Sequence, residues 1–115
     1  MKNDKKIILC GAGTVGKNNL YKMGAKSVHC FVDNNVQLQG GFIESKQVKS
    51  FDYLDESADD YDVVISVSNR YKSEITAMLN KKQIHYYDSI ESYLLEKSFH
   101  MENWEKLKGI HEGKS

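Results

Sequence analysis

Three glycines near the N-terminus are spaced in a way that suits the binding of phosphate. Gly11, Gly13 and Gly16 fit the pattern G-x-G-x-x-G within the stretch IILCGAGTVGKNNL. In such a turn the first glycine allows the bend, the second lets backbone approach a pyrophosphate, and the third lets helix pack against strand. Free N–H groups at the helix start would hold the phosphates. We therefore expect a phosphate site lined by Gly11, Gly13, Thr14, Val15 and Gly16.

A carboxylate follows at the spacing expected for a ribose contact. Asp33 lies 20 residues after Gly13, at the end of the next apolar run. In dinucleotide-binding domains an acid at this place accepts hydrogen bonds from ribose hydroxyls. Its charge would disfavour a 2′-phosphate, so NAD or another plain nucleotide is the expected cofactor, with Asn34 moderating this preference. The alternative is that Asp33 only shapes an Asp-Asn-Asn turn.

A polar loop, SVSNRY, follows a later apolar segment and contains further candidates. Ligands of open parallel sheets bind outside the carboxyl ends of the strands, where this loop would open. Ser66, Ser68, Asn69 and Arg70 are therefore expected to reach a nucleotide, and Arg70 is the chain's single arginine, whose planar group suits phosphate. Equally, Ser68 or Asn69 caps a helix and Arg70 is solvated.

No catalytic or metal-binding residues are expected. Tyr93 and Lys97 form Y-x-x-x-K, the spacing of the acid/base pair in short-chain dehydrogenases and sugar epimerases. A match this short arises by chance, and the neighbouring leucines favour a packing role for Tyr93. The chain's four histidines are scattered and show no pairing that suggests metal ligands: His29, His85, His100 and His111.

The composition is that of an ordinary soluble domain. The 115 residues carry 16 basic and 16 acidic side chains, and no basic cluster predicts nucleic-acid binding. No apolar stretch is long enough to span a membrane. Cys10 and Cys30 both lie in apolar runs without ligand spacing, so we expect them to be buried and reduced, as in a cytoplasmic protein.

The glycine turn must be positioned by a strand before it and a helix after it. Residues 7–10 are a continuous apolar run, typical of a strand buried on both faces. Residues 14–23 have helical periodicity and are followed by Gly24, which suits a helix end. A second strand is expected over 27–32. Together these segments have the size of one strand-helix-strand unit.

The rest of the chain continues the alternation. We expect, in order, a short strand within 42–48, a brief helix over 50–54, a strand over 63–67, a helix over 70–82, a strand over 84–87 and a final helix. Asp88 and Glu91 have the spacing of a capping box for that helix. The pattern predicts a three-layer α/β Rossmann-like domain with a parallel sheet of about five strands, over residues 1–97. A helical tail over 98–115 would dock on it, pair with a second copy or lead into another domain.

Five stretches together resemble a small Rossmann-like domain of cell-surface polysaccharide and nucleotide-sugar biosynthesis proteins, which is often attached to a transferase. They are also similar to the C-terminal domain of sugar C-methyltransferases. The stretches are IILCGAGTVGKNNL, CFVDNN, QGGFIESKQVKSFDYL, YDVVISVSNRYKSEI and IHYYDSIESYL. The resemblance implies a five-stranded parallel sheet, a bound nucleotide, dinucleotide or nucleotide-sugar, and no catalytic residues. Gly11, Gly13, Gly16 and Asp33 match the family's turn and acid, whereas Lys49 stands where the family usually has a proline.

Three functions follow from these observations. The first is a non-catalytic nucleotide-binding module that acts with an enzyme of surface-polysaccharide or sugar metabolism. The second is a minimal NAD-dependent oxidoreductase or sugar epimerase, which would need dimerisation to complete a substrate site. The third is a ligand-free scaffold that oligomerises through its C-terminal helix.

Overall fold

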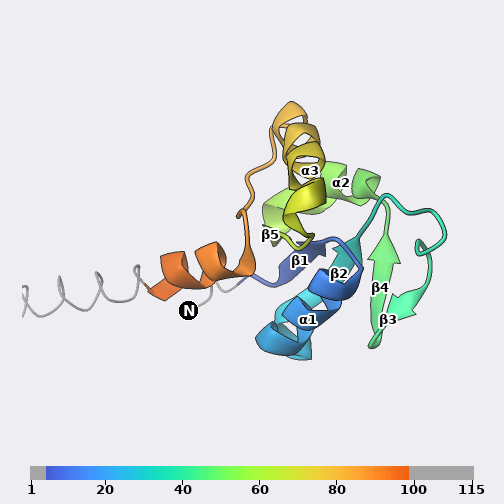
Figure 1. The fold of residues 1–115 in the computed structure, drawn as a ribbon, viewed down its shortest axis with the longest axis horizontal. Coiled ribbons are helices and arrows are strands. Elements are labelled where there is room, and N and C mark those ends of the chain that lie inside the picture. The colour runs from blue at the N-terminus through green and yellow to red at the C-terminus, as the bar shows by residue number, and fades with distance from the viewer. Residues whose placement is uncertain (1–4, 99–115) are drawn as a thin grey trace, which may run out of the picture.

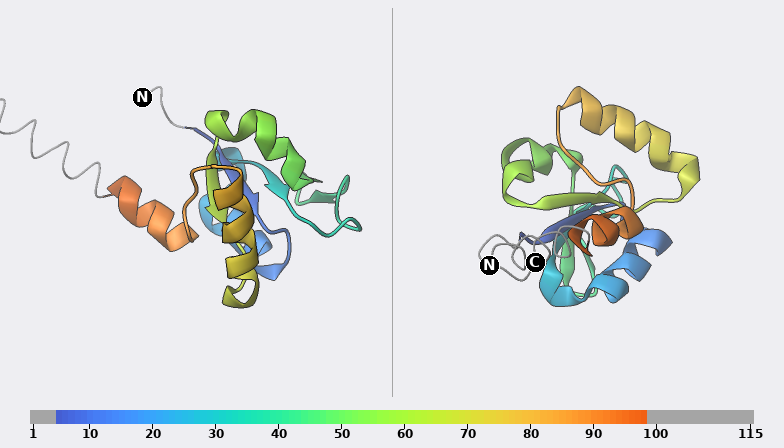
Figure 2. Two further views of the ribbon diagram at one scale, coloured as in Figure 1. Left: turned by 90° about the horizontal axis from the view of Figure 1, so that it is seen from above. Right: turned by 90° about the vertical axis from the view of Figure 1, so that its left-hand side faces the viewer.

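A five-stranded sheet lies between two layers of helices (Figure 1). The computed structural model describes residues 5–98. Helix α1 and a last helix over residues 90–98 cover one face, and α2 and α3 cover the other (Figure 2). Apart from residue 98, the helical tail expected over 98–115 lies outside the described residues. The described part is a three-layer α/β fold.

Strands and helices largely alternate along the chain as the sequence predicts, although β3 and β4 are consecutive strands and β5 ends two residues before the expected residue 67. The strands are β1 (Ile7–Cys10), β2 (Val28–Val32), β3 (Phe42–Ile43), β4 (Lys46–Lys49) and β5 (Asp62–Ile65). The α-helices are α1 (Thr14–Met23), α2 (Leu54–Ser57) and α3 (Asn69–Lys81), with short 3-10 turns η1 (Ala25–Ser27), η2 (Phe51–Tyr53) and η3 (Ala58–Asp60). No helix among the described residues is both long and apolar enough to cross a membrane.

The order of the strands creates a crevice beside β1. Across the sheet the order is β3-β4-β2-β1-β5, in which β4, β2, β1 and β5 are parallel and the edge strand β3 runs antiparallel to β4. The chain therefore builds outward from β1 in one direction and then returns to its other side at β5. Ligands of open α/β sheets bind at the carboxyl edge where the strand order reverses in this way. The prediction of a Rossmann-like α/β fold is confirmed.

Two differences from the prediction lie in the middle of the chain. The short strand expected within 42–48 is a hairpin of β3 and β4, because Glu44 and Ser45 both adopt positive φ, 49° and 71°, in the two-residue turn. Such turns usually carry glycine or asparagine, which is why the sequence does not reveal this one. The helix expected to end at Leu54 begins as η2 and continues as α2.

Two further differences follow α3. The strand expected over 84–87 is reduced to one bridge, in which the Tyr87 N–H donates to the Val63 carbonyl at 2.9 Å and the Ile65 N–H donates to the Tyr87 carbonyl at 2.9 Å. The N–H of Ile84 is unavailable to the sheet because it bonds to Leu79 at the end of α3. The last helix is capped by Ser89, whose Oγ accepts from the Ser92 N–H at 3.0 Å, so the expected cap lies one residue too early.

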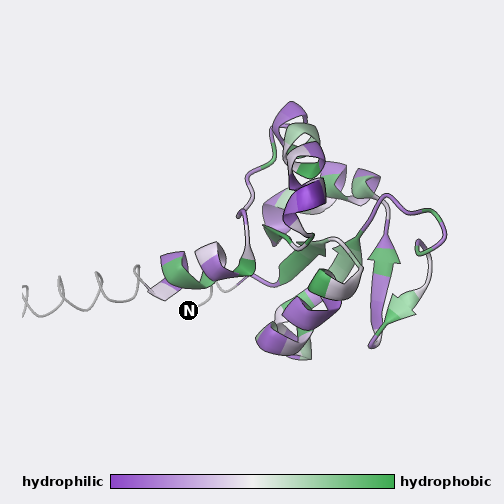
Figure 3. Ribbon diagram, viewed as in Figure 1, coloured by the Kyte–Doolittle hydropathy of each residue, from purple (hydrophilic) through white to green (hydrophobic). Residues whose placement is uncertain are grey.

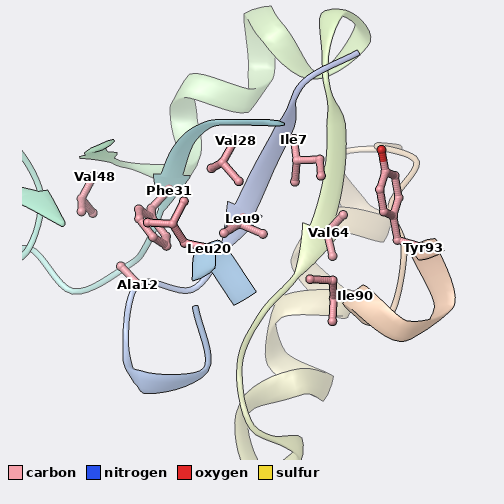
Figure 4. Packing of buried hydrophobic residues seen from close by; sticks show 10 residues of the cluster. All are labelled: Ile7, Leu9, Ala12, Leu20, Val28, Phe31, Val48, Val64, Ile90 and Tyr93. Carbon is pink, nitrogen blue, oxygen red and sulfur yellow. The ribbon is translucent and has the colours of Figure 1, made fainter. Parts of the chain in front are cut away.

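Two apolar clusters hold the layers together. One lies under α1 and the last helix and includes Leu9, Phe31 and Val64, each fully buried (Figure 4). The other lies under α2 and α3. Strand β1, which is green in Figure 3, supplies buried apolar side chains to both clusters. Cys10 and Cys30 are free and buried in the second cluster; burial raises the pKa of both thiols, that of Cys30 to about 11, so neither ionises near neutral pH.

Candidate functional site

The turn after β1 is pressed against the loop after β5. Gly11 has a φ of 126°, a conformation that side chains rarely adopt, and its N–H donates to the Val32 carbonyl at 2.8 Å. A Cβ at this position would lie 2.5 Å from both the Ser66 carbonyl oxygen and Val67 Cγ1. Only glycine therefore allows the turn to sit at the crevice between β1 and β5.

The other two glycines of the pattern face opposite environments. Gly16 is buried, and a Cβ there would overlap the carbonyl oxygen of Gly11 and lie 3.3 Å from Phe31 Cε1. Gly13 is exposed, and a Cβ there would meet no atom within 4 Å. Gly16 thus holds α1 against the turn, whereas the space above Gly13 is open.

The first turn of α1 presents unbonded backbone donors. The N-cap residue is Gly13, which has no side chain to cap the helix, and the first turn contains no acidic residue. The first bond of the helix runs from the Lys17 N–H to the Gly13 carbonyl at 2.9 Å. Within residues 5–98 the N–H groups of Thr14 and Val15 have no acceptor. Such donors, aligned with the positive end of a helix, suit an anion.

Asp33 links the end of β2 to the glycine turn. Its Oδ2 accepts a hydrogen bond from the Ala12 N–H at 2.8 Å, and its Oδ1 accepts one from the Asn35 N–H at 2.8 Å. The second bond shapes the Asp-Asn-Asn turn, as the alternative interpretation of Asp33 predicts. The first bond joins Ala12 and Asp33, which are 21 residues apart, and the spacing of the residues in the sequence does not predict it. Because each carboxylate oxygen has a further lone pair, Asp33 can still accept hydroxyl donors from a ligand.

A cavity of about 490 Å³ opens beside the turn, at the carboxyl edge. We call it the first cavity. Among its lining residues are Gly11, Gly13, Thr14, Val15, Asp33, Asn34, Ser66 and Ser68, which the sequence had indicated. The sequence does not indicate the other lining residues: Asn35, Leu38, Phe51, Val67, Tyr71, Glu74 and Ile75. Tyr71, Glu74 and Ile75 lie on one side of a helix that starts at this edge, a spacing that could have identified them.

A second cavity, of about 350 Å³, lies on the other side of the turn. It is lined by Val15, Asn18, Asn19, Lys22, Ile65, Val67, Ser68, Asn69, Lys72, Ser89, Ile90 and Glu91. Of the remaining expected site residues, Gly16 lies beneath the turn and Asn69 lines this second cavity. Arg70 lines neither cavity; its guanidinium lies 5.5 Å from the centre of the Tyr71 ring.

The Tyr93 and Lys97 pair lies at the opposite edge of the sheet. The Tyr93 hydroxyl donates to Asp62 Oδ2 at 2.9 Å, and Lys97 Nζ lies 3.5 Å from the same oxygen. Asp62 is the first residue of β5, so this network sits at the amino edge, away from both cavities. The Tyr93 ring also packs edge-on against Tyr87. Among the described residues, no group of three or more His, Cys, Asp or Glu is placed to hold a metal.

Replacing Gly16 by alanine should destabilise the fold more than the same change at Gly13. The methyl at residue 16 must displace the backbone of the turn, and overpacking costs about 1–3 kcal/mol. At Gly13 there is room, and alanine loses at most roughly 1 kcal/mol to glycine at a helix N-cap. Thermal unfolding followed by circular dichroism should give Gly16→Ala the lower Tm. Equal Tm values would contradict the close packing at residue 16.

Asp33→Asn should weaken the fold without any ligand present. An amide has one accepting oxygen, so either the Ala12 or the Asn35 N–H loses its acceptor, at a cost of about 0.5–1.5 kcal/mol. Urea unfolding measures this loss. Asp60→Asn is the matched control, because Asp60 is exposed and lines neither cavity. If both variants unfold at the same urea concentration, Asp33 does not hold the turn.

Solved structures with a similar fold bind or act on nucleotide compounds, according to their names. UDP-D-quinovosamine 4-dehydrogenase from Vibrio fischeri is 19% identical over 81% of this chain and 85% of that chain, with a TM-score of 0.56. RSP, a Rex-family repressor, is 18% identical over 92% of this chain, with a TM-score of 0.55, and this chain spans 64% of its length. RSP has also been solved with β-NAD⁺ and operator DNA; that structure is 17% identical with a TM-score of 0.54.

These similarities support the Rossmann-like fold and no finer relationship. The chain matches no family model and no curated protein at a significant level. The operator DNA bound by RSP does not fit the prediction, made from the lack of a basic cluster in this chain, that nucleic acid is not among its partners. Identities of 17–19% to these structures show how the chain folds.

Proposed function

We propose that this chain binds a nucleoside diphosphate compound at the carboxyl edge of its sheet. The diphosphate lies over the unbonded N–H groups of Thr14 and Val15, and the ribose lies on Asp33. The single observation that carries the proposal is the open space at Gly13. That space is bordered by the unbonded N–H groups at the start of α1 and by the carboxylate of Asp33, which lies where a ribose contact is expected.

The lining of the first cavity suits a nucleoside. Leu38, Phe51 and Ile75 supply apolar surface for a base, and Asp33 and Glu74 supply acceptors for hydroxyl groups. Among the described residues that line this cavity there is no lysine or arginine. A ribose 2′-phosphate would therefore meet two carboxylates and no basic side chain. The expected cofactor is NAD or a plain nucleotide, and NADP is disfavoured.

The structural neighbours support a nucleotide ligand. One is named as a dehydrogenase of a UDP-sugar, and the Rex-family repressor has been solved in complex with β-NADH. The resemblance to domains of polysaccharide and nucleotide-sugar biosynthesis agrees with this class of ligand.

The proposed role is that of a cytoplasmic, non-catalytic module that works with an enzyme of surface-polysaccharide or sugar metabolism. Tyr93 and Lys97 both contact Asp62 at the amino edge of the sheet and do not reach the cavities. The last helix supports contact with a partner, because Leu94 and Leu95 are 45% and 72% exposed on it. That partner would be a transferase domain or a second copy of this chain.

Isothermal titration calorimetry of NAD⁺, NADP⁺, ADP and UDP tests this proposal. At least one of NAD⁺, ADP and UDP should bind, and NADP⁺ should bind at least about tenfold more weakly than NAD⁺, a difference of about 1.4 kcal/mol. Gly13→Ala places a methyl where the diphosphate must lie and should weaken binding by a similar factor. Absence of binding by all four compounds would overturn the proposal.

Gly41→Ala is the matched control for the Gly13 variant. It makes the same chemical change at a glycine that lines neither cavity and whose Cβ would meet its nearest atom at an ordinary 3.4 Å. Its affinity should equal that of the parent chain. If both alanine variants bind as tightly as the parent, the diphosphate does not lie on the glycine turn.

A further inference from the structure

The two cavities are neighbours that share the rim of the glycine turn. Val15, Val67 and Ser68 line both of them. Beneath the rim, Asn19 Nδ2 donates to Ser66 Oγ at 2.9 Å, and both side chains are buried. Ser66 lines the first cavity and Asn19 lines the second. If the diphosphate of a ligand crosses the turn, the group attached to its second phosphate therefore lies in the second cavity.

The chemistry of the second cavity differs from that of the first. Its polar lining consists of Asn18, Asn19, Ser68, Asn69 and Ser89, together with two lysines and Glu91. Amide and hydroxyl groups both donate and accept hydrogen bonds, as a ring bearing several hydroxyl groups requires. No aromatic side chain is found among the described residues that line it. The surroundings suit a hydroxylated ring better than a planar aromatic one.

The lysines make the second cavity attractive to negative charge. Lys22 Nζ lies 3.8 Å from Glu91 Oε2, and both side chains are more than half exposed, so their attraction is weak. Lys72 projects from α3 and is half-buried. Within residues 5–98 it has no ion pair and no hydrogen bond. Among the described residues, therefore, no carboxylate lies within ion-pair distance of its ammonium group.

We propose that the second cavity binds the sugar of a nucleoside diphosphate sugar and favours a sugar that carries a carboxylate. This inference rests on the proposed function and names the class of its ligand. The base and ribose occupy the first cavity, the diphosphate crosses the turn, and the second sugar lies among the amides with its carboxylate near Lys72. A nicotinamide ring finds no aromatic side chain to stack on among the described residues of this cavity.

Calorimetry with stepwise larger ligands tests the assignment. UDP-glucuronate should bind at least fivefold more tightly than UDP, with UDP-glucose between them. NAD⁺ should bind no more tightly than ADP-ribose, which lacks the nicotinamide. Lys72→Ala should remove most of the preference for UDP-glucuronate over UDP and leave the affinity for UDP unchanged. Lys81→Ala is the matched control, because Lys81 is exposed on the same helix and lines neither cavity.

The outcomes separate this inference from the proposed function. If UDP or ADP binds but the attached sugar adds no affinity, the second cavity does not hold a sugar. If Lys72→Ala weakens UDP as much as UDP-glucuronate, Lys72 contacts phosphate and the assignment is overturned. If none of these diphosphates binds, the proposed function fails and the inference fails with it. Circular dichroism of each variant confirms that a lost affinity is not a lost fold.

Discussion

The close approach of three backbone segments at the crevice is the constraint on which the rest of the structure depends. The turn after β1, the first turn of α1 and the loop after β5 approach so closely that neither Gly11 nor Gly16 has room for a Cβ. This packing sets the start of α1 directly above the carboxyl end of β1. The unbonded N–H groups at the start of α1 therefore lie at the point where the strand order reverses. The candidate site is a consequence of how the fold closes.

The two cavities on either side of the glycine turn differ in polarity, so the carboxyl edge of the sheet is chemically asymmetric. Apolar side chains from η2 and α3 lie on one side with Asp33 and Glu74. Amides and two lysines lie on the other. Asp33 contributes both to the fold and to the candidate site, because its carboxylate accepts the Ala12 N–H of the turn and also lines the first cavity. An asymmetric ligand would have only one favourable orientation across such an edge.

The sequence predicts the parts of this arrangement that depend on local signals. The bounds of β1 and α1 follow from an apolar run, a helical period and Gly24, and the structure agrees with them. The sequence does not indicate the hairpin at Glu44 and Ser45, because its positive φ angles occur at residues that rarely adopt them. The sequence predicts only part of the lining of the first cavity, since Leu38 and Phe51 reach it from distant segments and nothing in their own spacing indicates the contact.

The central claim is that a diphosphate lies on the first turn of α1, and amide nuclear magnetic resonance tests it most directly. On addition of ADP or UDP to the ¹⁵N-labelled chain, the account predicts the largest shift changes at the N–H signals of Gly13, Thr14 and Val15. Smaller changes are predicted around Asp33 and Ser68. Signals at the amino edge, such as those of Asp62 and Tyr93, should not move. Binding that shifts the amino-edge signals and leaves residues 13–15 unchanged would contradict the account.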